Sequence, residues 1–151
     1  MPFKYLNIND LMISHSTEIR VRYAETDRMG YVYYGNYPTY FEVGRVEWLR
    51  ALGLSYKELE DSGTMLPVLN LHVKYIRPAR YDALLTLITR VEKWPGTRLE
   101  FHHEILGPTG ERLTLATVEL VFAHTDTGRP NNAPESVLNA MRPYFPEGSA
   151  E

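Results

Sequence analysis

The 151-residue sequence contains no cysteine, which excludes disulfide frameworks, thiolate metal sites and cysteine nucleophiles. It also lacks any lysine- or arginine-rich block, and its net charge is −3, so the charge pattern does not point to nucleic-acid binding. No apolar run approaches the roughly 18 residues of a membrane-spanning helix. Polar residues interrupt the apolar stretch of residues 1–20, which argues against a secretory signal. We therefore expect a cytoplasmic protein.

A chain of this length predicts one domain, 1–151, with a core that needs no disulfides. Residues 1–16 have weak periodicity and predict an N-terminal arm, and the polar residues 145–151 predict a frayed tail. Residues 18–23 alternate, with Ile19, Val21 and Tyr23 on one face, and predict a half-buried strand. Further strand patterns, separated by turn sequences, cover 69–75, 85–91, 99–105 and 111–124.

One long helix is predicted from 37 to about 52, with Asn36 as its N-cap, Pro38 in its first turn and Gly53 beyond its end. A glycine on its apolar stripe, Gly44, predicts close approach to a sheet. The stripe comprises Tyr37, Phe41, Gly44, Trp48 and Ala51, widened by Val46, Leu49 and Leu52, while Glu42, Arg45, Glu47 and Arg50 form the polar side.

Two shorter helices are predicted, one from Ser55 to about 61 and one from Asn132 to about 144. The order is then strand, long helix, short helix and four strands joined by short turns, which favour antiparallel pairing. The broad apolar stripe needs a partner, and a five-stranded antiparallel sheet curling around the helix supplies it. The predicted fold class is therefore α+β.

An isolated acid, Asp27, lies in the loop that leads to the long helix. A helix N-terminus offers unpaired N–H groups and a partial positive charge, which suits a carbonyl that gains negative charge when a carboxylate or an activated water attacks it. On the residues alone, an Asx-type turn is the favoured interpretation. The five histidines predict no metal site, because His102 and His103 are adjacent on a strand and point to opposite faces. No bound redox cofactor is expected.

The run YAETDRMGYVYYGNYPTYFEVGRVEWLRALG resembles the hotdog-fold acyl-CoA thioesterases, in the branch of 4-hydroxybenzoyl-CoA thioesterase and the YbgC-type enzymes. A second block, VKYIRPARYDALLTLITRV, resembles the strand boundary of the same family. Both blocks occur in the order and separation of the family. Two positions depart from it: Tyr34 stands where many YbgC-type members have histidine, and Glu25 where they have aspartate. A role for that histidine cannot be carried over.

The resemblance implies a hotdog fold and hydrolysis of an acyl-CoA or acyl carrier protein thioester. It implies that Asp27 is the catalytic carboxylate, as nucleophile or as general base, and that the backbone N–H groups of Tyr34 and Gly35 stabilise the oxyanion. Active sites of this family lie between subunits, so a homodimer or homotetramer is expected. The substrate-binding candidates are Tyr31, Tyr33, Tyr34, Asn36 and Tyr37, with Arg77 and Arg80 for the phosphates or pantetheine of the carrier.

Several readings remain open. The tyrosines could equally serve core or interface packing, and the arginines could form surface salt bridges. A hotdog hydratase or dehydratase would need a histidine near the helix, and no histidine lies between His15 and His72. A non-catalytic acyl-CoA binding module would keep a pocket without requiring Asp27.

Overall fold

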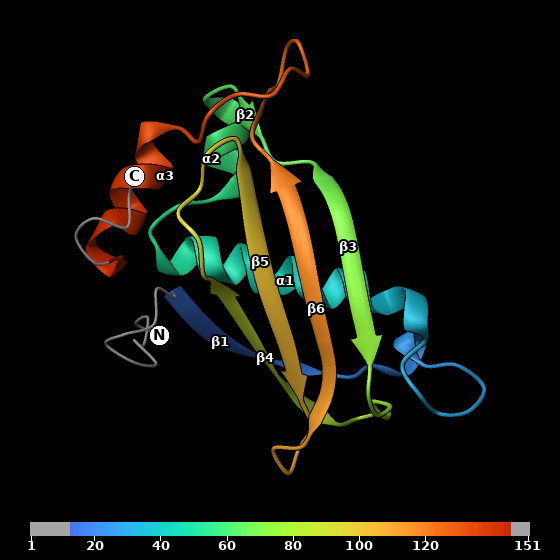
Figure 1. Cartoon of the computed structure of the whole chain (residues 1–151). Helices are drawn as coiled ribbons and strands as arrows, with labels where there is room; N and C mark the ends of the chain where they lie inside the picture. The colour runs from blue at the N-terminus through green and yellow to red at the C-terminus, as the bar shows by residue number, and fades with distance from the viewer. Residues whose placement is uncertain (1–12, 146–151) are drawn as a thin grey trace.

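The computed structural model describes residues 13–145, which form a five-stranded antiparallel sheet curved around one long helix (Figure 1). The sheet order is β1-β4-β5-β6-β3. Its strands are β1 (Ile13–Arg20), β3 (Val68–Tyr75), β4 (Leu84–Val91), β5 (Arg98–Leu106) and β6 (Arg112–Val121); the helices are α1 (Tyr37–Ala51), α2 (Tyr56–Asp61) and α3 (Glu135–Met141). The predicted α+β class, with a sheet wrapped around a central helix, is confirmed.

Helix α1 packs against the concave face of the sheet through large apolar side chains. Phe41 and Trp48 are fully buried, and the ring of Trp48 meets Phe101 of β5 edge-on at 5.1 Å. The close approach predicted at Gly44 is present, because a Cβ at this position would lie 2.4 Å from Oγ1 of Thr89 on β4. Only glycine allows the helix backbone to come this near the strand.

The buried face of α1 is wider than the predicted stripe. Tyr40 and Arg45 are both buried, whereas Ala51 is only half-buried. Arg45 was expected on the polar face, but it turns inward toward Tyr56, and within residues 13–145 it forms no ion pair with Glu42. A curved sheet encloses more of a helix than a flat one, so an arginine next to the stripe becomes part of the interior.

Strand β1 corrects two predictions. It begins at Ile13, so residues 13–16 belong to the sheet and not to an N-terminal arm; residues 1–12 lie outside the described part of the chain. It ends at Arg20, and a 3-10 turn (Tyr23–Glu25) follows. Tyr23 is consequently 79% exposed and does not continue the inward face of the strand.

The connections also differ from a simple row of hairpins. Strands β3 and β4 follow each other in sequence but lie apart, because β3 pairs with β6 at one edge while β4 pairs with β1 and β5. The long strand predicted over 111–124 ends at Val121. A short strand, β7 (Ala123–His124), then pairs with β2 (Thr64–Met65) in a second small sheet.

Helix caps follow the predictions in part. The Ser55 side chain accepts a hydrogen bond from the N–H of Glu58 at 3.1 Å, and Gly53 has a φ of 83° after α1. Asn36 occupies the N-cap of α1 without a side-chain cap, and α3 begins after Pro134 and not after Asn132. Within residues 13–145, no helix has the length and apolar character required to cross a membrane.

Candidate active site

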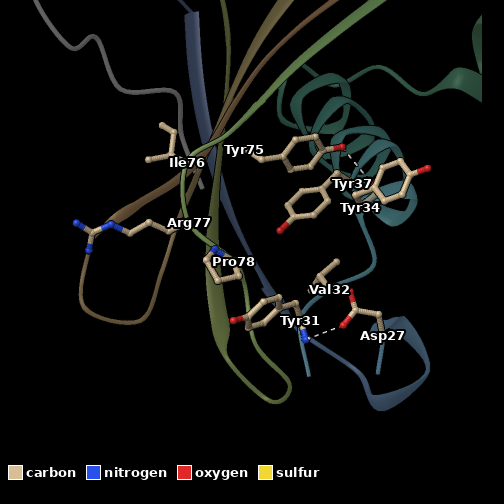
Figure 2. Close-up of a pocket in the computed structure, with 9 residues that line it drawn as sticks. All are labelled: Asp27, Tyr31, Val32, Tyr34, Tyr37, Tyr75, Ile76, Arg77 and Pro78. Atoms are coloured by element: carbon tan, nitrogen blue, oxygen red, sulfur yellow. Dashed lines mark hydrogen bonds between the residues drawn. The ribbon is translucent and has the colours of Figure 1, made fainter. Parts of the chain in front are cut away.

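A cavity of about 370 Å³ lies where the loop before α1 meets the end of strand β3 (Figure 2). We call it the first cavity. Figure 2 shows three tyrosines from α1, its preceding turn and β3 grouped on one side, with Asp27 and Tyr31 below them. The lining residues are Asp27, Tyr31, Val32, Tyr34, Tyr37, Tyr75, Ile76, Arg77 and Pro78.

The loop holds one oxygen of Asp27 and leaves the other available. Oδ1 accepts hydrogen bonds from the N–H groups of Met29 at 2.9 Å and Tyr31 at 3.2 Å, while the N–H of Asp27 donates to the carbonyl of Tyr31 at 2.7 Å. Gly30 closes this turn with a φ of 79°. Within residues 13–145, Oδ2 accepts no hydrogen bond, and Figure 2 shows it directed toward Val32. The Asx-type turn and an available carboxylate oxygen therefore coexist.

A 3-10 turn (Tyr34–Asn36) precedes α1 and supplies free donors. The first N–H groups of a helical turn have no acceptor inside it. In the described part of the chain, the N–H groups of Tyr34 and Gly35 also donate to no loop or side-chain acceptor, whereas the N–H of Asn36 donates to the carbonyl of Tyr33 at 2.9 Å. Such donors are suited to an oxyanion.

Three hydrogen bonds fix this turn. The carbonyl of Glu25 accepts from the N–H of Tyr33 at 2.9 Å and from Nδ2 of Asn36 at 2.9 Å. From the opposite side, the hydroxyl of Tyr75 on β3 donates to the carbonyl of Tyr34 at 2.9 Å. The donor groups are thereby held between the Asp27 loop and the edge strand.

The Glu25 side chain ties the same loop to α1. Its Oε1 accepts from the hydroxyl of Tyr40 at 3.0 Å and from the N–H of Arg22 at 2.8 Å. Burial, reinforced by the negative charge of Glu25, raises the pKa of Tyr40 far above its usual value. The phenol therefore stays protonated and keeps donating to Glu25 at neutral pH.

Two of the cavity tyrosines, Tyr37 and Tyr75, also remain protonated at neutral pH. Burial raises the pKa of Tyr37, with a smaller contribution from the charge of Asp27, and burial raises the pKa of Tyr75. The rings of Tyr37 and Tyr75 meet edge-on at 5.0 Å. Their hydroxyl groups can act as donors, and their rings give the cavity an apolar wall.

The structure brings five of the site residues predicted from the sequence to the first cavity: Asp27, Tyr31, Tyr34, Tyr37 and Arg77. The other four lie beside it. The ring of Tyr33 contacts that of Tyr34 in a tilted arrangement, with centroids 4.9 Å apart and an interplanar angle of 52°, and a Cβ at Gly35 would lie 2.6 Å from the Tyr33 ring. The side chain of Asn36 donates its hydrogen bond to the carbonyl of Glu25. The guanidinium of Arg80 lies 4.8 Å from the ring centroid of Tyr31.

Sequence reasoning missed several residues. Tyr75, Ile76 and Pro78 line the cavity, and Glu25 with Tyr40 organises its loop. A usable signal existed for Tyr75, because it ends an alternating strand directly before the Arg77-Pro78 break. No such signal exists for Tyr40, since it lies beside the apolar stripe of α1 and its hydrogen-bond partner, Glu25, is 15 residues away.

The histidines lie elsewhere. His103 is buried beneath α1 and His102 is half-exposed on the other face of β5, as their adjacent positions predict. Within residues 13–145, no group of three or more histidine, aspartate or glutamate side chains is arranged to hold a metal ion.

Comparison with known proteins places this chain in a family. A model of the thioesterase-like superfamily matches residues 21–141. The acyl-CoA thioester hydrolase YbgC of Escherichia coli is 31% identical over 120 residues, which cover 80% of this chain and 90% of that protein. The DHNA-CoA thioesterase from Staphylococcus aureus is 36% identical, with a TM-score of 0.82 over 86% of this chain and 89% of that one. A 1,4-dihydroxy-2-naphthoyl-CoA thioesterase from Synechocystis, 19% identical over 85% and 96% of the two chains, shares the fold with a TM-score of 0.79. The chain therefore belongs to the thioesterase-like superfamily and has the hotdog fold.

Proposed function

We propose that this protein is an enzyme that hydrolyses acyl-CoA thioesters to a carboxylic acid and free coenzyme A. Family membership and relatives named for this activity support the reaction class. One structural observation supports assigning this reaction to particular residues. Within residues 13–145, the Asp27 oxygen that accepts no hydrogen bond and the turn that bears the free N–H groups border the same cavity. Attack and charge stabilisation need these two groups on either side of a carbonyl.

In the proposed reaction the thioester carbonyl lies between Oδ2 of Asp27 and the N–H groups of Tyr34 and Gly35. The carboxylate either attacks the carbonyl carbon, forming an anhydride that water then cleaves, or removes a proton from the attacking water. On either route the oxyanion accepts hydrogen bonds from the backbone, the carbon–sulfur bond breaks, and the thiolate takes up a proton. No cofactor is required, because coenzyme A is part of the substrate.

Asp27→Asn tests the proposal. The amide keeps an oxygen that can accept from Met29 and Tyr31, so the loop should be retained, but it is neither a base nor a nucleophile. We expect kcat to fall by about 10²- to 10⁴-fold while a non-hydrolysable acyl-CoA analogue still binds. Thiol release across aromatic, short and long acyl-CoAs provides the measurement.

Asp126→Asn is the matched control, because it changes an exposed acid in a turn away from the first cavity. Unchanged turnover in Asp27→Asn would remove Asp27 from its proposed role. Acyl-CoA binding without thiol release in the wild type would instead favour a non-catalytic binding module. The nine residues that line the first cavity include no histidine, so hydration chemistry has no general acid/base of that type there.

We further propose that the enzyme is a homodimer formed by two-fold pairing of the β3 edges. Within residues 13–145, strand β3 pairs only with β6, and most of its apolar side chains are exposed, including Val68 at 50%, Leu71 at 41% and Tyr75 at 47%. An exposed apolar edge strand favours association with a second strand. Because Tyr75 also lines the first cavity, this interface would border the site. Three further predictions are compatible with this dimer: assembly into a tetramer, action on acyl carrier protein thioesters and a cytoplasmic location.

A further inference from the structure

A second cavity, of about 500 Å³, lies where α1, α2 and the start of β3 meet. Figure 1 shows α2 and β2 at the end of the sheet where β3 begins, whereas the first cavity lies where β3 ends. The eight residues of β3 separate the two cavities by roughly 20 Å, and the two linings share no residue. The lining residues of the second cavity are Glu42, Arg45, Val46, Tyr56, Glu60, Met65, Leu66, Pro67, Val68 and Leu120.

The second cavity has a buried guanidinium in its wall. Arg45 is 7% exposed, and within residues 13–145 it forms no ion pair. Its Nε is buried and has no hydrogen-bond partner in the same part of the chain. A buried charge without a counter-charge is costly, and a buried donor without an acceptor adds to that cost. The fold keeps this group beside a cavity that is large enough for a small molecule.

A neighbouring tyrosine uses only part of the hydrogen-bonding capacity of Arg45. The guanidinium donates to the hydroxyl of Tyr56. Burial raises the pKa of this tyrosine, while the charge of Arg45 opposes the shift, so the phenol is neutral at neutral pH and adds no counter-charge. A guanidinium carries five N–H donors, and a single hydroxyl cannot accept from all of them. Arg45 therefore retains donors for an acceptor that a ligand would bring.

The other lining residues determine the class of ligand. Two carboxylates in the lining, those of Glu42 and Glu60, are exposed to solvent. One cation and two anions leave the lining with an excess of negative charge, which disfavours an anionic ligand even beside Arg45. An uncharged oxygen can accept from the guanidinium without this repulsion. Most of the remaining wall is apolar: Val46, Met65, Leu66, Pro67, Val68 and Leu120.

We propose that the second cavity binds a small uncharged molecule with an apolar body and a carbonyl or hydroxyl oxygen at its buried end. The oxygen accepts a hydrogen bond from Arg45, and the apolar body packs against Met65, Leu66 and Leu120. A hydrocarbon would leave the guanidinium without an acceptor, and a carboxylate would face Glu42 and Glu60. This site is separate from the proposed reaction and does not depend on hydrolysis.

Titration of the isotope-labelled full chain with a panel of small uncharged ketones, alcohols and amides, followed by NMR, tests the ligand class. We expect saturable shifts at the residues that line the second cavity. For the ketone that binds most tightly, an analogue with a methylene group in place of the oxygen should bind at least about tenfold more weakly, the effect of one lost hydrogen bond to a charged group. The corresponding carboxylate should also bind more weakly than the ketone. No saturable binding by any member of the panel, or equal affinity for the three matched compounds, would overturn the proposal.

Two variants locate the ligand. Arg45→Met replaces the guanidinium by an unbranched apolar side chain, and Leu66→Trp fills the cavity while Arg45 stays in place. Both should weaken binding of the same ketone at least about tenfold, and Arg45→Met should also abolish the preference for the ketone over its methylene analogue. Arg50→Met, at an exposed position of the same helix outside the cavity, is the control and should retain wild-type affinity. Wild-type affinity in both cavity variants would show that the ligand lies elsewhere.

A competition experiment separates this site from the site of the proposed reaction. Val68 lines the second cavity and also begins the β3 edge at which we propose that two chains pair, so the ketone titration is repeated with a saturating non-hydrolysable acyl-CoA analogue. Simultaneous binding of both ligands is the expected result. Displacement of the ketone would assign the cavity to the thioester and overturn the inference. Neither result depends on whether the protein turns over a thioester.

Discussion

At the scale of single residues, His103 shows how the hotdog interior constrains a titratable group. Its ring is 2% exposed and stacks on Phe41 and Phe101, with centroids 5.0 and 6.1 Å away, and its Nδ1 lies 3.0 Å from Oγ1 of Thr89. Burial, with smaller contributions from Arg45 and His102, lowers the pKa of His103 to about 3. The imidazole therefore packs as a neutral, aromatic component of the core.

This residue predicts a loss of stability in acid. Between pH 6.5 and about 3 the unfolded chain binds a proton at His103 that the folded chain does not, so the stabilisation is complete above pH 6.5 and declines below it. We expect His103 to account for roughly 2 kcal/mol of the fall in unfolding free energy between pH 7.5 and 5.0. Urea unfolding of wild type and His103→Gln at both pH values measures it.

The informative quantity is the change in unfolding free energy between the two pH values, since the substitution also disturbs packing at both. A His124→Gln control replaces an exposed histidine. If His103→Gln retained the full pH dependence of the wild type, the buried imidazole would not be its source.

At the scale of elements, the site depends on a turn held between a loop and an edge strand. Glu25 fixes the Tyr34–Asn36 turn from the loop, and Tyr75 fixes it from β3. An oxyanion donor contributes only when it is aimed at the position that the developing charge will occupy. Tyr75 is thus a positioning residue for the proposed chemistry, acting through the carbonyl of Tyr34.

Tyr75→Phe removes the hydroxyl and keeps the ring that packs on Tyr37. We expect kcat to fall by about fivefold, equivalent to one hydrogen bond of about 1 kcal/mol, with a smaller change in KM. Steady-state kinetics with one acyl-CoA measures the separate effects on kcat and KM. Tyr144→Phe, in the last turn of the described chain, serves as control. An increase in KM alone would show that the hydroxyl serves substrate binding and not the turn.

The elements also show what the sequence could and could not predict. The loop from Asp27 to Gly35 and helix α1 were predictable because their residues are contiguous and their caps and periodicity are local. The inward turn of Arg45 was not, because it depends on the curvature of the sheet around α1. The sequence marks Tyr75 as the end of a strand, but its place beside the cavity, and that of Ile76, depend on the pairing of β3 with β6, a contact that no local pattern encodes.

The early start of β1 had a similar cause. Residues 13–16 have no clear alternation, yet they pair with Ile88–Val91 of β4. Long-range pairing completes a strand whose own sequence is ambiguous. The predicted position of Asn36 at the helix start was correct, but its side chain donates to the carbonyl of Glu25 and does not cap the helix.

At the scale of the whole molecule, the two edges of the sheet are unequal. Strand β1 packs against α1, and Ile13, Ser14 and His15 are buried. Strand β3 is exposed along most of its length and carries apolar side chains. A two-fold dimer through β3 would cover these side chains and leave the β1 edge free.

Leu71→Arg on β3 should therefore convert a dimer to a monomer and lower thioesterase activity by at least about tenfold, because the first cavity loses the wall that the partner would provide. Sedimentation equilibrium gives the mass, and assays over a range of enzyme concentrations give the activity. Ser16→Arg, at an exposed position on the β1 edge, is the matched control. A wild type that sediments as a monomer at all concentrations would refute the dimer.

The asymmetric hydrogen bonding of Asp27 has a stereochemical consequence. Because Met29 and Tyr31 hold one oxygen, the carboxylate cannot rotate about its bond to the chain, and its lone pairs keep one direction. In the proposed reaction a thioester would then be approached from a single side of its plane. The face of the carbonyl that is attacked would in this way be set by two peptide groups of the turn from Asp27 to Tyr31.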